Sequence, residues 1–159
     1  MSEIIGVIGA GTMGNGIAQV CARAGYEVIL RDVKDEFLQR GLAAIDRSLQ
    51  RDVDKARLTE EAKREIVGRV RPTTDARELS RADFVVEAVT ENFAVKADIF
   101  RTLDELCQPE TILASNTSSI SITKLGGATR RAELGDRDRG GVRRENRLGP
   151  RQLVQLAED

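Results

Sequence analysis

Residues 4–19 read IIGVIGAGTMGNGIAQ, and this stretch decides the fold. The apolar, β-branched run over residues 4–8 is typical of a short strand that is buried on both faces. Apolar side chains then recur at intervals of three and four residues from Met13 to Ala24, which predicts a helix, and Gly25 ends it. The sequence therefore predicts a strand, a glycine turn and a helix in succession.

A glycine pattern, G-x-G-x-x-G, occupies the turn between this strand and this helix. Its six residues are Gly9, Ala10, Gly11, Thr12, Met13 and Gly14. Asp32 stands eighteen residues after the last glycine, at the end of a second strand expected over residues 27–30. In this context the pattern predicts a dinucleotide site, because the free N–H groups of the helix bind the pyrophosphate and the carboxylate binds the adenosine ribose.

The carboxylate of Asp32 also bears on which dinucleotide is bound. It repels a 2′-phosphate and so favours NAD over NADP, although Arg31 beside it weakens that preference. The alternative interpretation is that the glycines only shape a turn.

Strands and helices alternate along the rest of the chain. Apolar spacing predicts a long helix from Phe37 or Leu38 to Val53, and a second helix begins after Thr59. Further strands are expected over residues 83–89 and 111–115, with a helix over 94–106 between them. This order is typical of an α/β protein of the Rossmann type, with a doubly wound, mainly parallel sheet.

The composition changes near Thr129. Residues 130–159 contain eight arginines, six acidic residues and no lysine, and few of the residues before Leu148 are apolar. We expect one domain over residues 1–129, followed by a poorly ordered tail over 130–159. Within that tail, only residues 148–156 have the spacing of a short helix.

The overall composition excludes several classes of protein. A net charge of -1 provides no field that would attract nucleic acid or an anionic membrane. The apolar run over residues 4–17 is broken by five glycines, unlike a signal peptide or a membrane span, so the cytoplasm is the expected location. Cys21 and Cys107 lack the spacing of metal ligands and are expected to be reduced thiols. The chain contains no histidine, the commonest general base.

Two polar clusters follow the later strands. The segment VEAVTEN over residues 86–92 contains Ala88 and Glu91, and Lys96 lies just beyond it. The segment ASNTSS over residues 114–119 brings Asn116 and Ser118 to the end of the next strand. Two plainer interpretations stay open at this point, a surface ion pair between Glu91 and Lys96 and a loop whose hydroxyl groups only cap a helix.

Three segments together resemble the NAD-dependent 3-hydroxyacyl-CoA dehydrogenases. They are GAGTMGNGIAQ over residues 9–19, VVEAVTEN over 85–92 and ASNTSS over 114–119, and the resemblance extends over residues 1 to about 129. It implies that NAD contacts the glycine turn, Asp32, Ala88, Glu91 and Lys96. It also implies that Ser118 and Asn116 lie at the reacting part of the substrate. Ser48 and Lys55 match positions that bind acyl-CoA in this family, although a solvated helix face is the alternative.

One departure from the family pattern concerns catalysis. The family continues after this loop into a His-Phe-Asn-Pro motif, whose histidine forms an acid–base dyad with a glutamate, whereas this chain reads RRAELG over residues 130–135. The helical C-terminal domain that completes the acyl-CoA cleft and the dimer interface in the family is also expected to be absent, which leaves the oligomeric state open. Two explanations of the tail stay open, a shifted reading frame and a deletion. The faint resemblance of residues 148–157 to a piece of the family's C-terminal domain favours the deletion.

These observations predict the NAD-binding portion of an oxidoreductase that interconverts 3-hydroxyacyl-CoA and 3-oxoacyl-CoA. Because the dyad histidine is missing, we expect little or no turnover from this chain alone. The alternatives are one half of a split dehydrogenase and a non-catalytic NAD-binding module that senses redox state. An acyl-CoA substrate is the expected partner, and neither a nucleic acid nor a membrane is.

Overall fold

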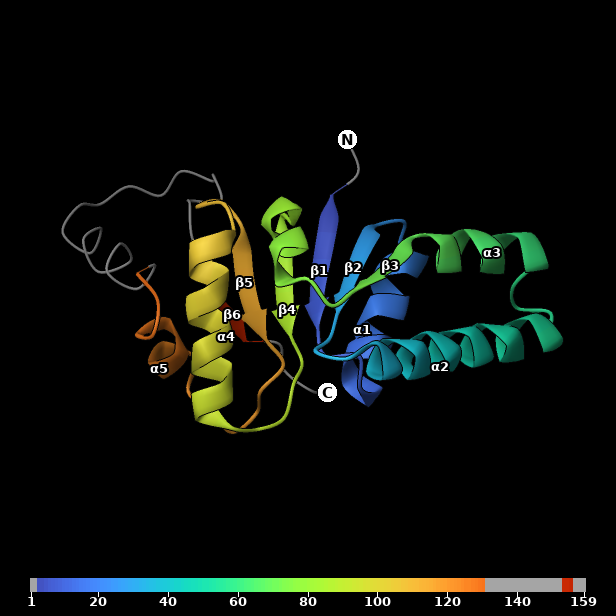
Figure 1. Cartoon of the computed structure of the whole chain (residues 1–159). Helices are drawn as coiled ribbons and strands as arrows, with labels where there is room; N and C mark the ends of the chain where they lie inside the picture. Colours follow the sequence, from blue (N-terminus) through green and yellow to red (C-terminus); the bar gives the residue numbers. More distant parts are fainter. Residues whose placement is uncertain (1–2, 131–152, 156–159) are drawn as a thin grey trace, which may run out of the picture.

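A computed structural model describes residues 3–130 and 153–155 (Figure 1). Its centre is a six-stranded sheet in the order β3-β2-β1-β4-β5-β6, and every neighbouring pair of strands is parallel. The strands are β1 (Ile4–Ile8), β2 (Glu27–Arg31), β3 (Val70–Thr73), β4 (Phe84–Glu87), β5 (Ile112–Ser115) and β6 (Leu153–Gln155). The predicted α/β fold with a doubly wound parallel sheet is therefore confirmed.

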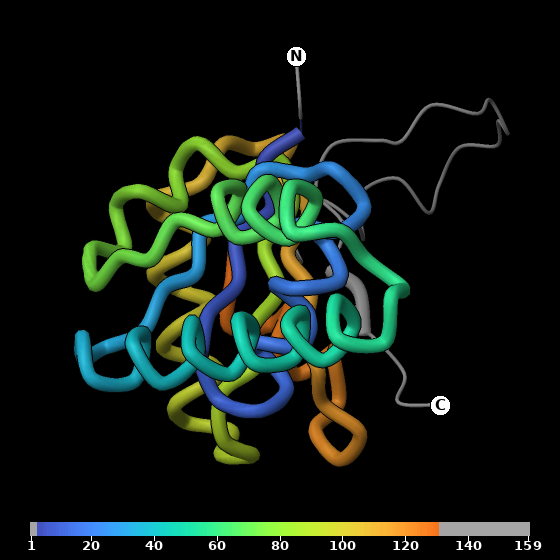
Figure 2. The backbone as a smooth tube through the Cα atoms, turned by 90° about the vertical axis from the view of Figure 1, so that its right-hand side faces the viewer, coloured from blue at the N-terminus to red at the C-terminus, as the bar shows by residue number. Residues whose placement is uncertain are grey.

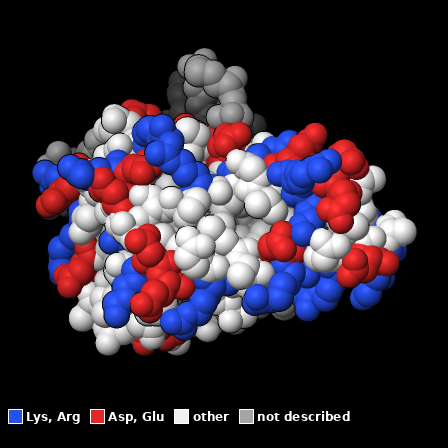
Figure 3. All heavy atoms as spheres, turned by 45° about the vertical axis from the view of Figure 1, so that its right-hand side comes forward, with Lys and Arg blue, Asp and Glu red and all other residues white. Residues whose placement is uncertain are grey.

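Helices cover both faces of this sheet. They are α1 (Thr12–Arg23), α2 (Asp35–Asp54), α3 (Glu60–Gly68), the 3-10 helix η1 (Ala76–Arg81), α4 (Phe93–Leu106) and α5 (Ile122–Gly126). The first three lie on one face of the sheet and the last three lie on the other. Figures 1 and 2 show α2 and α3 side by side next to β3. Figure 3 shows acidic and basic side chains mixed over the part of the surface that these two helices form, as their charged outer positions predict.

Two hydrophobic cores hold the layers together. On one face, Leu38, Ile45 and Leu49 of α2 pack toward β1 and β2, so the apolar spacing of the long helix is confirmed. On the other face, Phe100 and Leu103 of α4 pack beneath β4 and β5. All five side chains are almost fully buried. Burial of this size, about 1.5–3 kcal/mol for each large apolar side chain, fixes each helix against its strands.

The edges of the sheet differ from the prediction. Strand β3 was not predicted from the sequence. Its four residues include Pro72, and burial does not alternate along them, because both central positions are exposed. The helix predicted over residues 148–156 is wrong where the structure describes it, because Leu153–Gln155 form β6 instead. Pairing with the open edge of β5 decides this short segment, whose local preference is weak. The remainder of the predicted tail lies outside the described residues.

The parallel arrangement fixes where a site can form. The carboxyl ends of β1, β2, β4 and β5 meet at one edge of the sheet, so the glycine turn and the three loops that follow the other strands converge there. Within the described residues, no helix has both the length and the apolar character needed to cross a bilayer. The same residues contain no group of three histidine, cysteine or acidic side chains placed to hold a metal ion.

Candidate functional site

The turn between β1 and α1 needs glycine at two positions for steric reasons. Gly9 has a φ of 100°, and a Cβ atom there would lie 2.7 Å from the carbonyl oxygen of Ala88. A Cβ atom on Gly14 would lie 1.7 Å from the carbonyl oxygen of Gly9. By contrast, a Cβ atom on Gly11 would meet no atom within 4 Å. The protein itself therefore leaves the space in front of Gly11 open.

The first turn of α1 presents its N–H groups without a capping side chain. Its N-cap residue is Gly11, no side chain bonds to the first turn, and that turn contains no acidic residue. The hydroxyl of Thr59 caps α3 and the amide oxygen of Asn92 caps α4, whereas α2 and α5, like α1, have no side-chain cap. The bare N-terminus of α1 is an anion-binding arrangement of the kind that holds phosphates.

Asp32 lies directly beside this turn. Its Oδ2 atom accepts a hydrogen bond of 2.7 Å from the N–H of Ala10, and its Oδ1 atom accepts one of 2.6 Å from the N–H of Val33. The carboxylate is only half-buried, so its remaining lone pairs face the solvent. Asp32 therefore ties the glycine turn to the end of β2 and still has capacity to bind a hydroxyl group.

Two cavities meet at Asp32. The smaller, of about 320 Å³, is lined by Ala10, Gly11, Thr12, Asn15, Asp32, Phe37 and Arg40. The larger, of about 570 Å³, extends from the glycine turn across the ends of β2 and β4 to α4, and its lining includes Ala88, Val89, Val95 and Ile99. Gly11 and Asp32 line both. An open glycine turn, a bare helix N-terminus and a carboxylate between two cavities fit a dinucleotide.

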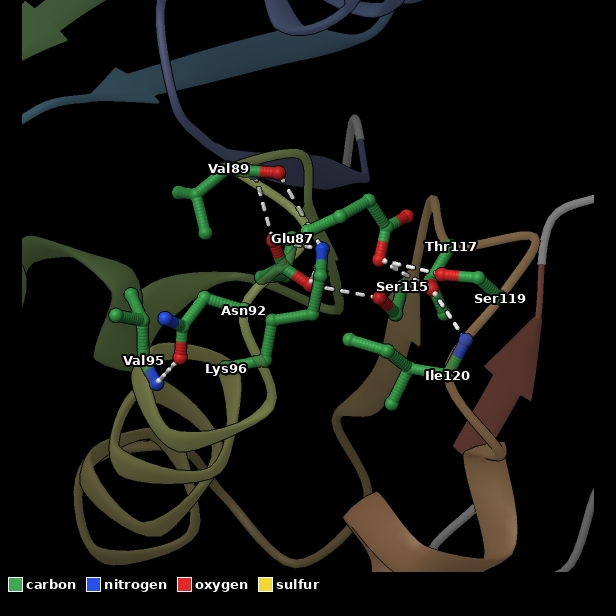
Figure 4. A network of polar contacts seen from close by, with 10 residues as sticks. Glu87, Val89, Asn92, Val95, Lys96, Ser115, Thr117, Ser119 and Ile120 are labelled. Atoms are coloured by element: carbon green, nitrogen blue, oxygen red, sulfur yellow. Dashed lines mark hydrogen bonds and ion pairs between the residues drawn. The ribbon is translucent and has the colours of Figure 1, made fainter.

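A buried ion pair joins β4 to α4 close to Val89 and Val95, which line the larger cavity (Figure 4). Lys96 of α4 and Glu87 of β4 are both fully buried, and the Nζ atom lies 2.8 Å from each carboxylate oxygen. The Oγ atom of Ser115 in β5 donates a hydrogen bond of 2.6 Å to Glu87, and the N–H of Val89 donates another of 2.6 Å. Each charge is thus paired and hydrogen-bonded, which is the condition for keeping it away from water.

A second carboxylate joins the loops that follow β4 and β5. The Oε2 atom of Glu91 accepts a hydrogen bond of 2.9 Å from the hydroxyl of Thr117 and one of 3.3 Å from the hydroxyl of Ser119. The N–H of Asn116 donates to the carbonyl oxygen of Glu87 at 2.8 Å. Glu87 and Glu91 therefore both connect the loop after β4 with the loop after β5.

Comparison with known proteins identifies the family to which this arrangement belongs. The model of the 3-hydroxyacyl-CoA dehydrogenase NAD-binding domain matches residues 4–134. The chain belongs to this family. The cofactor of the domain is accordingly NAD, and the resemblance found in the three sequence segments is confirmed.

Individual relatives agree with the family assignment. The chain is 47% identical over 129 residues to a 3-hydroxybutyryl-CoA dehydrogenase of Bradyrhizobium diazoefficiens, which is 81% of this chain and 44% of that protein. It is 41% identical over 131 residues to a 3-hydroxyadipyl-CoA dehydrogenase of Escherichia coli, or 82% of this chain and 28% of that protein. The chain thus spans under half the length of these relatives.

Solved structures give the same result for the fold. The crystal structure of an (S)-3-hydroxybutyryl-CoA dehydrogenase from Ralstonia eutropha superposes with a TM-score of 0.81 at 44% identity, over 84% of this chain and 47% of that chain. The superposition covers most of this chain, so the chain shares the fold of that dehydrogenase over this part.

Most of the residues predicted from the family lie at this site. The residues that line the cavities are Gly9, Ala10, Gly11, Thr12, Asp32 and Ala88, whereas Met13, Gly14 and Glu91 do not line them. Ser118 is exposed beyond the end of β5, and Asn116 is half-buried. The surface ion pair considered between Glu91 and Lys96 is wrong, because Lys96 is fully buried and pairs with Glu87. Deep burial of a lysine requires a carboxylate partner, which only the fold brings within reach.

The two predicted acyl-CoA residues lie elsewhere. Ser48 is half-buried in α2, and Lys55 is exposed just after that helix ends. Neither lines the cavities at Asp32. At 1.5 Å per residue, Ser48 is roughly 20 Å along the axis from the start of α2. The structure does not bring these residues to the glycine turn.

Sequence reasoning missed the role of two buried residues, Glu87 and Ser115. Both belong to quoted segments, but neither was expected to carry a function. An acidic residue that directly follows two valines in a buried strand was a usable signal, because such a charge needs a partner. The identity of that partner depends on the pairing of β4 with β5, which no local pattern specifies.

Proposed function

We propose that this chain binds NAD through its glycine turn and Asp32, as the cofactor-binding part of an enzyme that interconverts 3-hydroxyacyl-CoA and 3-oxoacyl-CoA. One observation carries the proposal: the Asp32 carboxylate is fixed by two N–H groups between two cavities, next to the uncapped N-terminus of α1. The bare N–H groups suit the pyrophosphate, and the carboxylate suits the adenosine ribose.

The other proposed cofactor residues have different roles in binding. Glu91 and Ala88 lie on the loop after β4, where the nicotinamide half would pass. Lys96 cannot present its ammonium group directly, because Glu87 and the carbonyl oxygen of Val89 surround it. Its contribution is to hold that loop in place. Ser118 and Asn116, on the neighbouring loop, would face the oxygen of the substrate at C3.

We propose acyl-CoA as the class of substrate and do not specify its acyl group. The two named relatives act on different acyl groups, a hydroxybutyryl and a hydroxyadipyl group, so similarity to them does not select a chain length. Ser48 and Lys55 are the residues through which α2 would contact the CoA portion. A charged, exposed helix surface is the alternative for both.

Catalysis needs a base that this sequence lacks. NAD, when bound, would supply the hydride acceptor for oxidation at C3 of the hydroxyacyl group, and a base of the protein would have to take up the proton of the 3-hydroxyl group. The 159 residues contain no histidine, and Ser118 is a weak base. Loss of a general base typically costs about 10²–10⁴-fold in rate. We therefore propose that this chain binds the cofactor with little or no turnover of its own.

Calorimetry on the whole chain tests the cofactor proposal. NAD should bind clearly more tightly than NADP, and Asp32→Ala should remove most of the difference. Gly11→Ala and Gly16→Ala form a matched pair, because an added Cβ atom meets no atom within 4 Å at either position. Only Gly11→Ala, which fills the space before the helix N-terminus, should weaken NAD binding. Equal affinity of the unmodified chain for NAD and NADP would contradict the role given to Asp32.

The histidine-free sequence also favours a second candidate, one half of a split dehydrogenase. The test supplies the C-terminal half of a related enzyme and follows NADH formation from 3-hydroxybutyryl-CoA. Turnover that appears only with both halves would establish the split enzyme. Turnover by the chain alone, in material that mass spectrometry shows to be free of full-length enzyme, would contradict the proposed inactivity. A redox-sensing module would instead discriminate between NAD and NADH and stay inactive with any added half.

A further inference from the structure

Arg31, the last residue of β2, occupies an unusual position next to Asp32. The register of β1 with β2 pairs it with Ile8, so its side chain lies on the α4 face of the sheet, opposite to the Asp32 carboxylate. Its Nε atom is buried and has no hydrogen-bond partner, and no ion pair is formed by Arg31 within the described residues. Asp75 attracts the Arg31 guanidinium group electrostatically but forms its ion pair with Arg77, so Arg31 keeps hydrogen-bonding capacity for a ligand.

The side chain stands where two cavities adjoin. One is the cavity of about 570 Å³ that contains Asp32, and the other is a cavity of about 190 Å³ beneath α4. Arg31 and Ile99 line both of them. If Asp32 binds the adenosine ribose, the base on that ribose must extend into the part of the larger cavity that Arg31 borders. This step rests on the proposed NAD function.

The walls of this part of the cavity suit a flat, apolar ring. Val33 follows β2, Val89 follows β4, and Val95 and Ile99 project from α4. Val33 is 64% exposed and Val95 is 41% exposed, which is unusual for valines and leaves apolar surface available to a ligand. A guanidinium group is planar, remains charged and stacks on aromatic faces. The surroundings thus supply apolar edges, the cationic plane of Arg31 and the carboxylate of Asp98, which also lines both cavities and pairs with Arg101.

From these observations we infer that Arg31 is a cofactor-binding residue whose guanidinium plane stacks on the adenine ring of the bound dinucleotide. The alternative for an arginine in this position is binding of the 2′-phosphate of NADP. The geometry disfavours that role, because the 2′-hydroxyl lies on the Asp32 side and Arg31 lies on the opposite face of the strand.

Binding measurements with parts of the cofactor test this inference. Arg31→Leu should raise the Kd of NAD and of ADP-ribose roughly three- to thirtyfold, the range of one cation–π contact. Arg31→Lys keeps the charge but loses the plane, so it should recover only part of the affinity. The Kd of nicotinamide mononucleotide, which lacks adenosine, should be unchanged in both variants. Arg64→Leu, at an exposed arginine of α3, controls for the change in net charge.

Three other results would each contradict a particular claim about Arg31 or about NAD binding. ADP-ribose binding to Arg31→Leu within twofold of the unmodified chain would overturn the role of Arg31 while leaving the NAD proposal intact. A loss confined to NADP would assign Arg31 to the 2′-phosphate. Failure of the unmodified chain to bind NAD or ADP-ribose would overturn both proposals. Circular dichroism of each variant, and its thermal unfolding without ligand, separate lost binding from lost folding.

Discussion

Replacing Lys96 by methionine should lower the free energy of unfolding by about 3–5 kcal/mol, because it leaves the Glu87 carboxylate buried without its counter-charge. Both side chains are fully buried, and the Nζ atom contacts both oxygens of the carboxylate. The hydrogen bonds from Ser115 and Val89 remain in the variant, but neither brings a positive charge. A domain of this size is typically stable by only 5–15 kcal/mol, so the loss is a large fraction of the total.

A second variant separates the cost of the unpaired charge from the cost of lost packing. The double substitution Glu87→Gln with Lys96→Met removes both charges and keeps the shapes similar, so most of the lost stability should return. Urea unfolding followed by circular dichroism measures all three proteins. Arg64→Met is the matched surface control, since Arg64 and its partner Glu61 are about 70% exposed, and it should change stability by less than about 0.5 kcal/mol.

Two results would refute this reasoning. A loss below about 1 kcal/mol in Lys96→Met would mean that water or another cation reaches Glu87. A double variant as unstable as the single one would mean that the pair acts through packing and not through charge.

Three further predictions concern other parts of the chain. Gly14→Ala should destabilise the protein severely in a thermal scan, because its Cβ atom would lie 1.7 Å from a carbonyl oxygen, whereas Gly16→Ala in the same helix should stabilise it by about 0.5–1 kcal/mol. Burial raises the pKa of the Cys21 thiol, so iodoacetamide should modify Cys21 more slowly than a free peptide thiol at pH 8, as peptide mass spectrometry would show, and faster as the pH rises. Hydrogen bonds from Arg77 hold the pKa of Asp75 below its usual range, so the stability that Asp75 contributes is present above pH about 4 and is lost as the pH falls through the lowered pKa. The difference in Tm between the unmodified chain and Asp75→Asn should therefore narrow in acid.

The first half of the fold is predictable because its signals are local. The spacing of Gly9, Gly14 and Asp32 is typical of a strand–turn–helix–strand unit. The structure places all three residues at one edge of the sheet. The apolar face of α2 follows from its periodicity for the same reason. These elements can therefore be predicted without knowledge of any distant contact.

The elements that were missed depend on distant contacts. β6 forms by pairing with the edge of β5, and β3 forms by pairing with β2. Lys96 and Glu87 are nine residues apart in the sequence. Ser115, which also bonds to Glu87, is 28 residues away from it. Sequence spacing alone suggested Glu91 as the ion-pair partner of Lys96. The packing of α4 against β4 buries Lys96 and brings its ammonium group to Glu87 instead.

The hydrogen bonds of Glu91 also bear on how the two ligands of a complete enzyme would influence one another. Glu91 is the proposed cofactor contact, and the two hydroxyl groups bonded to it, from Thr117 and Ser119, flank the proposed substrate contact Ser118. A shift of either loop must stretch or break bonds to the other. We therefore expect NAD and acyl-CoA to change each other's affinity, and thermodynamic linkage requires the factor to be the same in both directions.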